Sequence, residues 1–291
     1  MKYNTVSSNN QSTKKLYQKF RYGLIKRHFY YLTSSVRVLP NFFVIGAGRT
    51  GTTSLYHYLN QHPCITKSAY DELGYFDDNF HLGLNWYRSL FPSVLTKIFV
   101  KRKTKAFLTY DVTPSYVRKP WVAKRIHDMF PSTKLIVVLR NPADKSYSQY
   151  HQSVTLKEKR TFEHVIKEEM DNILKWKTEL KDDNYFATVV ENSILGRGLY
   201  AEQLPAWFDL FSKNQIMIIQ SEKLSSDTKN VMNDIFQFLG LPIFDIPNTK
   251  KVNVLQYSKM NPETRELLIN FFKPYNEKLF GMLGRRFNWN E

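Results

Sequence analysis

The sequence predicts a three-layer α/β fold, in which helices cover both faces of a central parallel sheet. The main observation is an alternation: short apolar runs typical of buried strands are followed by helical patterns of about 10–15 residues. The composition, 42% hydrophobic and 15% aromatic residues, allows a large core. No Pro-, Gly- or Ser-rich linker divides the sequence, so we expect one domain over residues 41–291.

Four apolar runs are expected to form the strands of this sheet, because each is short and bounded by turn residues. They are Phe42–Ile45, Phe107–Tyr110, Leu135–Leu139 and Ile216–Ile219. Helices are expected where apolar residues recur at helical spacing. These segments are Thr52–Asn60, Lys119–Met129, Ala143–Gln152, Phe162–Leu174, Leu199–Phe211, Asn230–Leu239 and Pro262–Leu279.

Residues 1–40 are expected to form a basic segment ahead of this domain. Residues 1–15 are polar and expected to be disordered, and residues 16–32 have the spacing of a weak amphipathic helix. That helix would pack on the domain's own surface or lie on a membrane surface. No apolar stretch reaches the ~18–20 residues that span a bilayer, and nothing resembles a signal peptide. We therefore expect a cytoplasmic protein, with peripheral membrane contact as an option.

The chain is strongly basic, since 42 Lys and Arg against 26 Asp and Glu give a net charge of +16. The excess lies near the N-terminus, because the first acidic residue is Asp71. Such a charge favours an anionic partner, which composition leaves open among nucleic acid, a phospholipid surface and an acidic substrate. The single cysteine, Cys64, excludes an internal disulfide and a cysteine-rich zinc site, and no metal site is expected.

A phosphate-binding loop is predicted between the first strand and the first helix. Gly46, four further residues, Gly51, Thr52 and Thr53 follow the Walker A frame, with Thr52 in place of the lysine. Backbone amides, the helix N-terminus and hydroxyl groups that include Ser54 should hold a phosphate there. Without the lysine, an enzyme that hydrolyses or transfers a γ-phosphate loses its main electrostatic clamp.

A second anion site is predicted where the most strand-like run ends. Arg140 follows that run directly, and Ser148 comes eight residues later, about two turns along a helix that begins near Pro142. A guanidinium at the carboxyl end of a strand is suited to a phosphate. Taken alone, Arg140 could equally form a structural ion pair. Together with the first loop, it suggests a nucleotide with phosphates at two ends.

The two segments resemble the nucleotide motifs of sulfotransferases that use 3′-phosphoadenosine 5′-phosphosulfate (PAPS). IGAGRTGTTSLYHYLNQHP resembles their 5′-phosphosulfate loop and LIVVLRNPADKSYSQYHQ their 3′-phosphate motif, within a resemblance over most of residues 41–289. Within that family, the sequence pattern most resembles carbohydrate sulfotransferases of the heparan sulfate N- and 3-O-type. The resemblance implies a P-loop-like fold, PAPS as the donor and no metal. It assigns the 5′-phosphosulfate to Arg49, Thr50, Gly51, Thr52, Thr53 and Ser54, and the 3′-phosphate to Arg140 and Ser148.

Two catalytic residues follow from the same resemblance. Sulfuryl transfer by in-line displacement requires a base for the acceptor and a cation for the leaving phosphate. Glu72 matches the position of the family's catalytic glutamate, with Asp71 beside it as a possible substitute, and Arg49 stands where relatives usually carry lysine. The family's basic C-terminal turn is absent, and its loose substitutes are Lys250, Lys251 and Lys259.

The resulting prediction is a transferase that moves a sulfuryl group to a hydroxyl or amino group of a carbohydrate or glycolipid. The identity of the acceptor and the choice between O- and N-sulfation stay open. The alternatives are a nucleotide kinase-like P-loop enzyme and a basic module that binds membrane or nucleic acid. Because Arg49 and Arg140 are assigned to the donor, the basic residues of positions 1–40 fit a membrane surface or an anionic acceptor better than nucleic acid.

Overall fold

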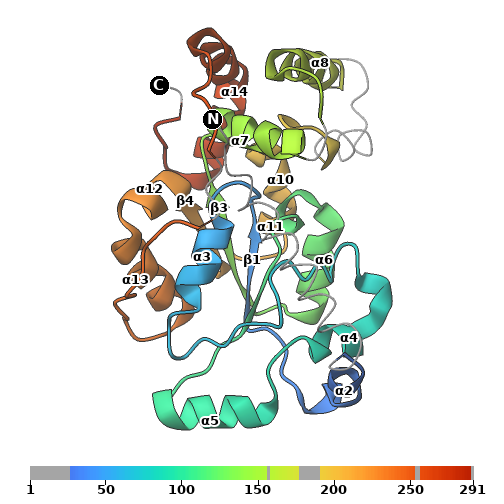
Figure 1. Cartoon of the computed structure of the whole chain (residues 1–291), viewed down its shortest axis with the longest axis vertical. Coiled ribbons are helices and arrows are strands. Elements are labelled where there is room, and N and C mark those ends of the chain that lie inside the picture. Colours follow the sequence, from blue (N-terminus) through green and yellow to red (C-terminus); the bar gives the residue numbers. More distant parts are fainter. Residues whose placement is uncertain (1–26, 156–157, 177–190, 253–255, 290–291) are drawn as a thin grey trace, which may run out of the picture.

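The structure is a computed structural model that describes residues 27–155, 158–176, 191–252 and 256–289. Its centre is a four-stranded parallel sheet in the order β2-β1-β3-β4, with helices on both faces (Figure 1). The predicted α/β fold class is confirmed. The strands are β1 (Phe42–Gly46), β2 (Tyr110–Val112), β3 (Lys134–Leu139) and β4 (Ile216–Gln220).

The helices that surround this sheet range from single turns to one of 22 residues. They are α2 (Arg27–Leu32), α3 (Thr52–Leu59), α4 (Gly83–Ser89), α5 (Val94–Thr104), α6 (Pro120–Met129), α7 (Pro142–Thr155), α8 (Phe162–Lys175), α10 (Tyr200–Gln203), α11 (Pro205–Phe208), α12 (Ser221–Ser226), α13 (Thr228–Leu239) and α14 (Pro262–Leu283). Short 3₁₀ turns include η2 (Ser34–Val36) and η4 (Tyr116–Arg118).

Each face of the sheet has its own hydrophobic core, because successive side chains of a strand point to opposite faces. Phe42 and Val44 pack in a cluster with apolar residues of α3 and α13. Phe43 and Ile45 belong to the other cluster, which includes residues of α6, α10 and α11. All five residues of β1 are buried, as expected for a strand covered on both faces.

A third cluster joins α7, α8 and α14 beyond the carboxyl ends of the strands (Figure 1). Ile166 of α8 and Leu268 and Phe272 of α14 pack there with Ala143 of α7. The cluster fixes the first turns of α7 directly after β3. The segments that follow β1 and β3 therefore begin side by side at one edge of the sheet, which is where ligands bind in such folds.

Two elements differ from their predicted form: one strand is shifted along the sequence, and one helix is split in two. The second strand was predicted over residues 107–110, but β2 begins at Tyr110 and includes the fully buried Asp111. A buried charged residue is unusual in a strand, so the apolar pattern did not reveal the true extent of β2. The helix predicted over residues 199–211 is split into α10 and α11, because Pro205 cannot donate a backbone hydrogen bond and begins a new helix instead.

Helices α4, α5 and α12 were not predicted. Residues 1–15 lie outside the described residues, and so do residues 16–26 of the helix predicted over residues 16–32. The described part of that predicted helix, α2, is helical. The chain after α2 contacts the domain, since Arg37 Nη1 donates to the Phe91 carbonyl at 2.7 Å and the Val38 amide to the Pro92 carbonyl at 3.0 Å. Among the described residues, no helix combines the length and the apolar character that crossing a membrane requires.

Candidate functional site

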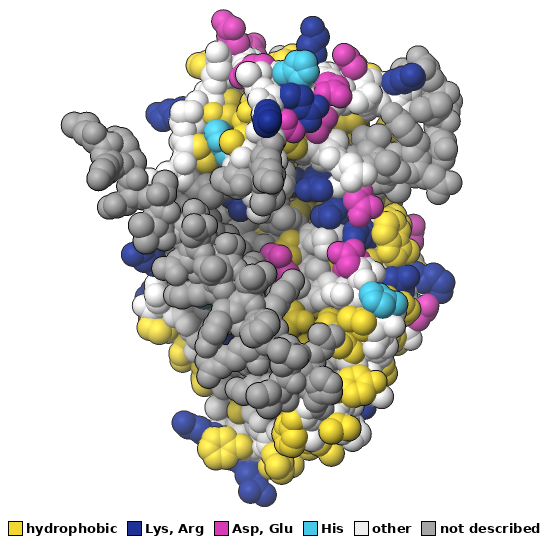
Figure 2. All heavy atoms as spheres, turned by 45° about the vertical axis from the view of Figure 1, so that its right-hand side comes forward, with side chains coloured by type: hydrophobic (Ala, Val, Ile, Leu, Met, Phe, Trp, Pro, Cys, Tyr) yellow, Lys and Arg dark blue, Asp and Glu magenta, His cyan; other side chains and the backbone are white. Residues whose placement is uncertain are grey.

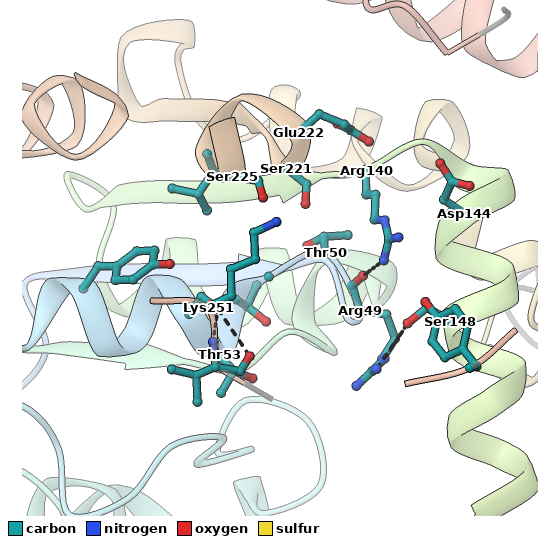
Figure 3. A pocket seen from close by; sticks show the side chains of 17 residues that line it. Arg49, Thr50, Thr53, Arg140, Asp144, Ser148, Ser221, Glu222, Ser225 and Lys251 are labelled. Atoms are coloured by element: carbon teal, nitrogen blue, oxygen red, sulfur yellow. Dashed lines mark hydrogen bonds between the residues drawn. The ribbon is translucent and has the colours of Figure 1, made fainter. Parts of the chain in front are cut away.

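A cavity of about 390 Å³ lies at the carboxyl edge of the sheet (Figure 3). The residues that line it come from the loop after β1, from α3, α7 and α12, and from the segment around Lys251. Every residue predicted to bind the donor lines this cavity: Arg49, Thr50, Gly51, Thr52, Thr53, Ser54, Arg140 and Ser148. Two motifs that are about 90 residues apart in sequence thus form one site.

The loop after β1 reverses sharply before α3. Gly51 has φ 98°, a conformation that glycine adopts without a steric penalty, and Arg49 has φ 66°. The Thr50 hydroxyl donates to the Ala47 carbonyl at 2.7 Å, and the Ala47 amide donates to the Val138 carbonyl of β3 at 2.8 Å. The first amides of α3 have no acceptor inside the helix, so they are available to an anion.

The guanidinium groups of Arg49 and Arg140 connect the two motifs. Nε and Nη2 of Arg49 each donate to Ser148 Oγ at 3.2 Å, and Nη1 of Arg140 donates to the Arg49 carbonyl at 3.5 Å (Figure 3). The Tyr200 hydroxyl donates to the Arg140 carbonyl at 3.0 Å. Burial lowers the pKa of Arg49; Arg140 lowers it further, whereas Tyr257 and Glu72 oppose this. A bound anion would offset this crowding of positive charge.

Several lining residues were not assigned to the site from sequence. Lys251, named only as a loose substitute, extends toward Ser221 of α12 in Figure 3. Its neighbour is anchored, because the Val252 amide donates to Ser54 Oγ at 3.0 Å. No spacing rule relates residue 251 to the loop around residue 54; only the fold brings them together.

Two acidic residues also line the cavity, and both have partners. Asp144 pairs with Arg265 of α14, and Glu222 Oε1 accepts the Asn141 amide at 2.9 Å. The cavity's cations are Arg49, Arg140 and Lys251. The site is therefore built to receive negative charge. No group of three or more His, Cys, Asp or Glu side chains in the described parts of the chain is arranged to hold a metal ion.

Glu72 lies on an exposed loop and does not line the cavity. Its charge nevertheless acts on Arg49, so the two groups are neighbours. Among the described residues, the non-glycine residues with positive φ are Arg49, Glu72 and Lys105. Two of these three are the predicted catalytic residues, and such backbone conformations concentrate at functional sites.

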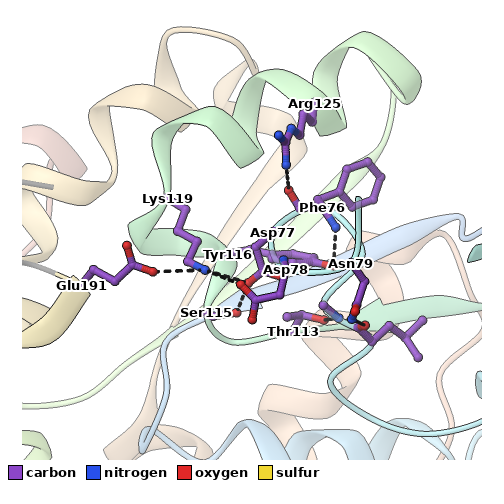
Figure 4. A network of polar contacts seen from close by, with 12 residues as sticks. Phe76, Asp77, Asp78, Asn79, Thr113, Ser115, Tyr116, Lys119, Arg125 and Glu191 are labelled. Atoms are coloured by element: carbon purple, nitrogen blue, oxygen red, sulfur yellow. Dashed lines mark hydrogen bonds and ion pairs between the residues drawn. The ribbon is translucent and has the colours of Figure 1, made fainter. Parts of the chain in front are cut away.

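Hydrogen bonds to the end of β2 hold the loop that carries Glu72. The Glu72 amide donates to the Val112 carbonyl at 2.8 Å, and the Gly74 amide donates to Thr113 Oγ1 at 3.2 Å. Lys119, only 6% exposed, pairs with Asp77 at 3.3 Å, Asp78 at 3.2 Å and Glu191 at 3.2 Å (Figure 4). The loop is thus fixed at both of its ends.

Asp111 is the buried centre of this support. Its carboxylate accepts hydrogen bonds from the hydroxyls of Thr113 at 2.7 Å, Tyr87 at 2.8 Å and Tyr116 at 3.1 Å. Burial raises the pKa of Asp111 to about 6, although these three donors favour the charged form. Thr113 connects Asp111 to the loop that carries Glu72, since its hydroxyl donates to Asp111 and accepts from the Gly74 amide of that loop.

Comparison with known proteins identifies the family. Residues 39–269 match the sulfotransferase domain. The chain belongs to the sulfotransferase family. The family predicted from the two motifs is therefore confirmed.

The relatives in this family include one named as membrane-associated and others named for heparan sulfate. The chain is 30% identical to the membrane-associated sulfotransferase kil1 of Dictyostelium discoideum, over 86% of this chain and 66% of the relative. It is 26% identical to human bifunctional heparan sulfate N-deacetylase/N-sulfotransferase 2, over 85% of this chain and 30% of that protein. The chain thus spans about two thirds of the first relative and under a third of the second.

One solved structure is similar to this chain over most of the chain's length. The crystal structure of a sulfotransferase from Alicyclobacillus acidocaldarius superposes with a TM-score of 0.62 and 25% identity. The match covers 87% of this chain and all of that one. The sheet order and the flanking helices described above are therefore those of a sulfotransferase fold.

Asp111→Asn should change how stability depends on pH. Because the folded protein raises this carboxyl's pKa from 3.8 to about 6, the native state keeps a proton that the unfolded chain loses near pH 4. The contribution of Asp111 to the free energy of unfolding should therefore fall by about 3 kcal/mol between pH 4 and 6, and it should be constant at higher pH. Urea denaturation across this range should show the decline in the wild type and in the exposed control Asp209→Asn. A decline of equal size in Asp111→Asn would contradict the assignment.

Proposed function

We propose that this chain transfers a sulfuryl group from PAPS to a hydroxyl or amino group of a carbohydrate or glycolipid acceptor. The observation that carries the proposal is the convergence of both predicted phosphate motifs on one cavity, joined by Arg49 and Ser148. Relatives named for heparan sulfate and for glucosamine support a carbohydrate as the acceptor. Contact of residues 1–40 with a membrane surface and a cytoplasmic location are further parts of the proposal; nucleic acid is not an expected partner.

The residues of the cavity fit PAPS, which carries phosphate groups on both sides of its ribose. The curled loop and the start of α3 supply amide and hydroxyl donors for the 5′-phosphosulfate. Arg140 and Ser148 supply a cation and a hydroxyl for the 3′-phosphate. Lys251 adds a third cation, in the role left open by the missing C-terminal turn. A volume of about 390 Å³ lies in the range of small-ligand pockets.

The chain's own residues account for the chemistry that transfer needs. When bound, PAPS supplies an activated sulfuryl group whose leaving group is a phosphate. Arg49, oriented by its two hydrogen bonds to Ser148, stabilises the negative charge that develops on that phosphate. Glu72 takes the proton from the acceptor's hydroxyl or amino group, and the fixed loop keeps its carboxylate near Arg49. Asp111 and Thr113 position this loop.

The kinase-like alternative is less well supported. A γ-phosphate clamp needs a lysine at the position of Thr52, whose side chain is short, neutral and almost buried. Membership of the sulfotransferase family also argues against it. Incubation of the protein with ATP and a panel of glycan and glycolipid acceptors should therefore yield no phosphorylated product.

Arg140→Ala should weaken binding of 3′-phosphoadenosine 5′-phosphate (PAP), the product without the sulfuryl group. At 100 times its dissociation constant, PAP should stabilise the wild type by about 2.7 kcal/mol, which raises the melting temperature by roughly 5 °C. Loss of a charged hydrogen bond costs about 1.5–3 kcal/mol, so most of this rise should disappear. Thermal melts with and without PAP measure it, with Arg102→Ala on the exposed helix α5 as control. A full rise in Arg140→Ala would overturn the 3′-phosphate assignment.

Glu72→Gln should lower the rate of sulfuryl transfer by at least about 100-fold, because a general base is lost while the shape of the side chain is kept. PAP binding should be unchanged, since Glu72 does not line the cavity. Asp71→Asn is the matched control and should keep most of the activity. Transfer of label from PAPS to a panel of glycan and glycolipid acceptors measures the rates. If Asp71→Asn is inactive and Glu72→Gln is active, Asp71 is the base and Glu72 is not.

A further inference from the structure

Helix α5 forms one end of the molecule and has no buried residue (Figure 1). Its apolar side chains face solvent, since Leu95 is 77% exposed, Phe99 70%, Ile98 43% and Val94 40%. A helix of eleven residues, none of them buried, gains little stability from packing on the domain. An exposed apolar helix face of this kind usually marks an interaction site.

The charges of α5 are arranged around that apolar face. At about 100° per residue, Val94, Leu95, Ile98 and Phe99 occupy one arc of the helix. Lys97 and Lys101 border the arc on one side and Lys103 on the other, while Arg102 lies toward its C-terminal end. No acidic residue occurs between Asp78 and Asp111. The helix therefore combines an apolar arc with a purely basic border.

The chain before β1 extends the same surface. Leu32 of α2 is 80% exposed and Val36 of η2 is 55% exposed. An antiparallel bridge between Arg37 and Ser93, the N-cap of α5, brings this segment beside the helix. Figure 2 shows hydrophobic and basic side chains gathered at the corresponding lower end of the molecule. We define the α5 surface as the four apolar residues of α5 with Leu32 and Val36.

We propose that the α5 surface docks on an anionic phospholipid bilayer. An apolar arc bordered by lysines and arginines is the arrangement that lies in a membrane interface, with the rings and aliphatic groups among the acyl chains and the cations at the headgroups. Anionic headgroups complement the basic border, and nothing acidic opposes them on the helix. The proposal does not depend on the proposed sulfotransferase activity.

Docking by α5 would orient the enzyme. Residues 105–109 lead from α5 into the amino end of β2, whereas the cavity lies at the carboxyl edge of the sheet. The two features therefore face opposite ends of the molecule, and α7 lies far from α5 in Figure 1. A docked molecule holds its cavity away from the lipid headgroups, so it would act on a glycan that reaches beyond the bilayer surface.

Vesicle sedimentation with the full chain tests this proposal. The chain should bind vesicles of phosphatidylserine and phosphatidylcholine much more than vesicles of phosphatidylcholine alone. The double variant Leu95→Ser/Phe99→Ser should bind at least about tenfold less, because the apolar contact is lost. Lys97→Gln/Lys101→Gln/Lys103→Gln should also bind less, and it should lose most of the preference for phosphatidylserine.

The control variant is Ile243→Ser/Leu267→Ser, since these residues are 71% and 50% exposed and lie on other elements. It should bind as the wild type does, and all variants should keep the wild-type melting temperature, because only exposed side chains change. Wild-type binding by Leu95→Ser/Phe99→Ser would overturn the proposal. The same holds if deletion of residues 1–26 abolishes binding while the α5 variants retain it, because the basic N-terminal segment would then be the membrane contact.

Discussion

The parallel pairing of β1 with β3 is the constraint on which the site depends. Residues Phe42–Val44 pair with residues Lys134–Ile136 in a parallel register, so both strands end at the same edge of the sheet. Arg49 and Ser148, in the segments that follow these strands, can therefore meet, and the guanidinium donates two hydrogen bonds to the hydroxyl. The third cluster of apolar residues, around Phe272, holds α7 in place for this contact.

Keeping so many cations at one edge has an energetic cost. Burial and neighbouring cations lower the pKa of Arg49, and they lower the pKa of the fully buried Lys145 of α7 to about 7. The positive φ of Arg49 and Glu72 adds backbone strain of order 1–3 kcal/mol each. A fold retains such features where a ligand compensates them, and a polyanionic nucleotide would do so.

Much of this organisation could be predicted from sequence, because it is local. A glycine-rich turn between a strand and a helix indicates a phosphate loop, and Arg140 after the strongest apolar run indicates a second anion site; both segments line the same cavity. Asp111 hid the extent of β2, since its burial depends on hydroxyl donors, one of which, Tyr87, comes from the distant helix α4. Lys251 could not be assigned to the site, because only the fold brings it beside the loop around Ser54. The α5 surface could not be predicted from the sequence, because its apolar residues are exposed and belong to no core.

In the proposed function, one cavity binds phosphates on both sides of the ribose. Calorimetric titration of the full chain with PAP and with adenosine 5′-monophosphate, which lacks the 3′-phosphate, tests it directly. Because charged hydrogen bonds to the 3′-phosphate contribute about 1.5–3 kcal/mol each, PAP should bind at least about tenfold more tightly. Equal affinities for the two nucleotides would contradict the account, because Arg140 and Ser148 would then have no phosphate to bind.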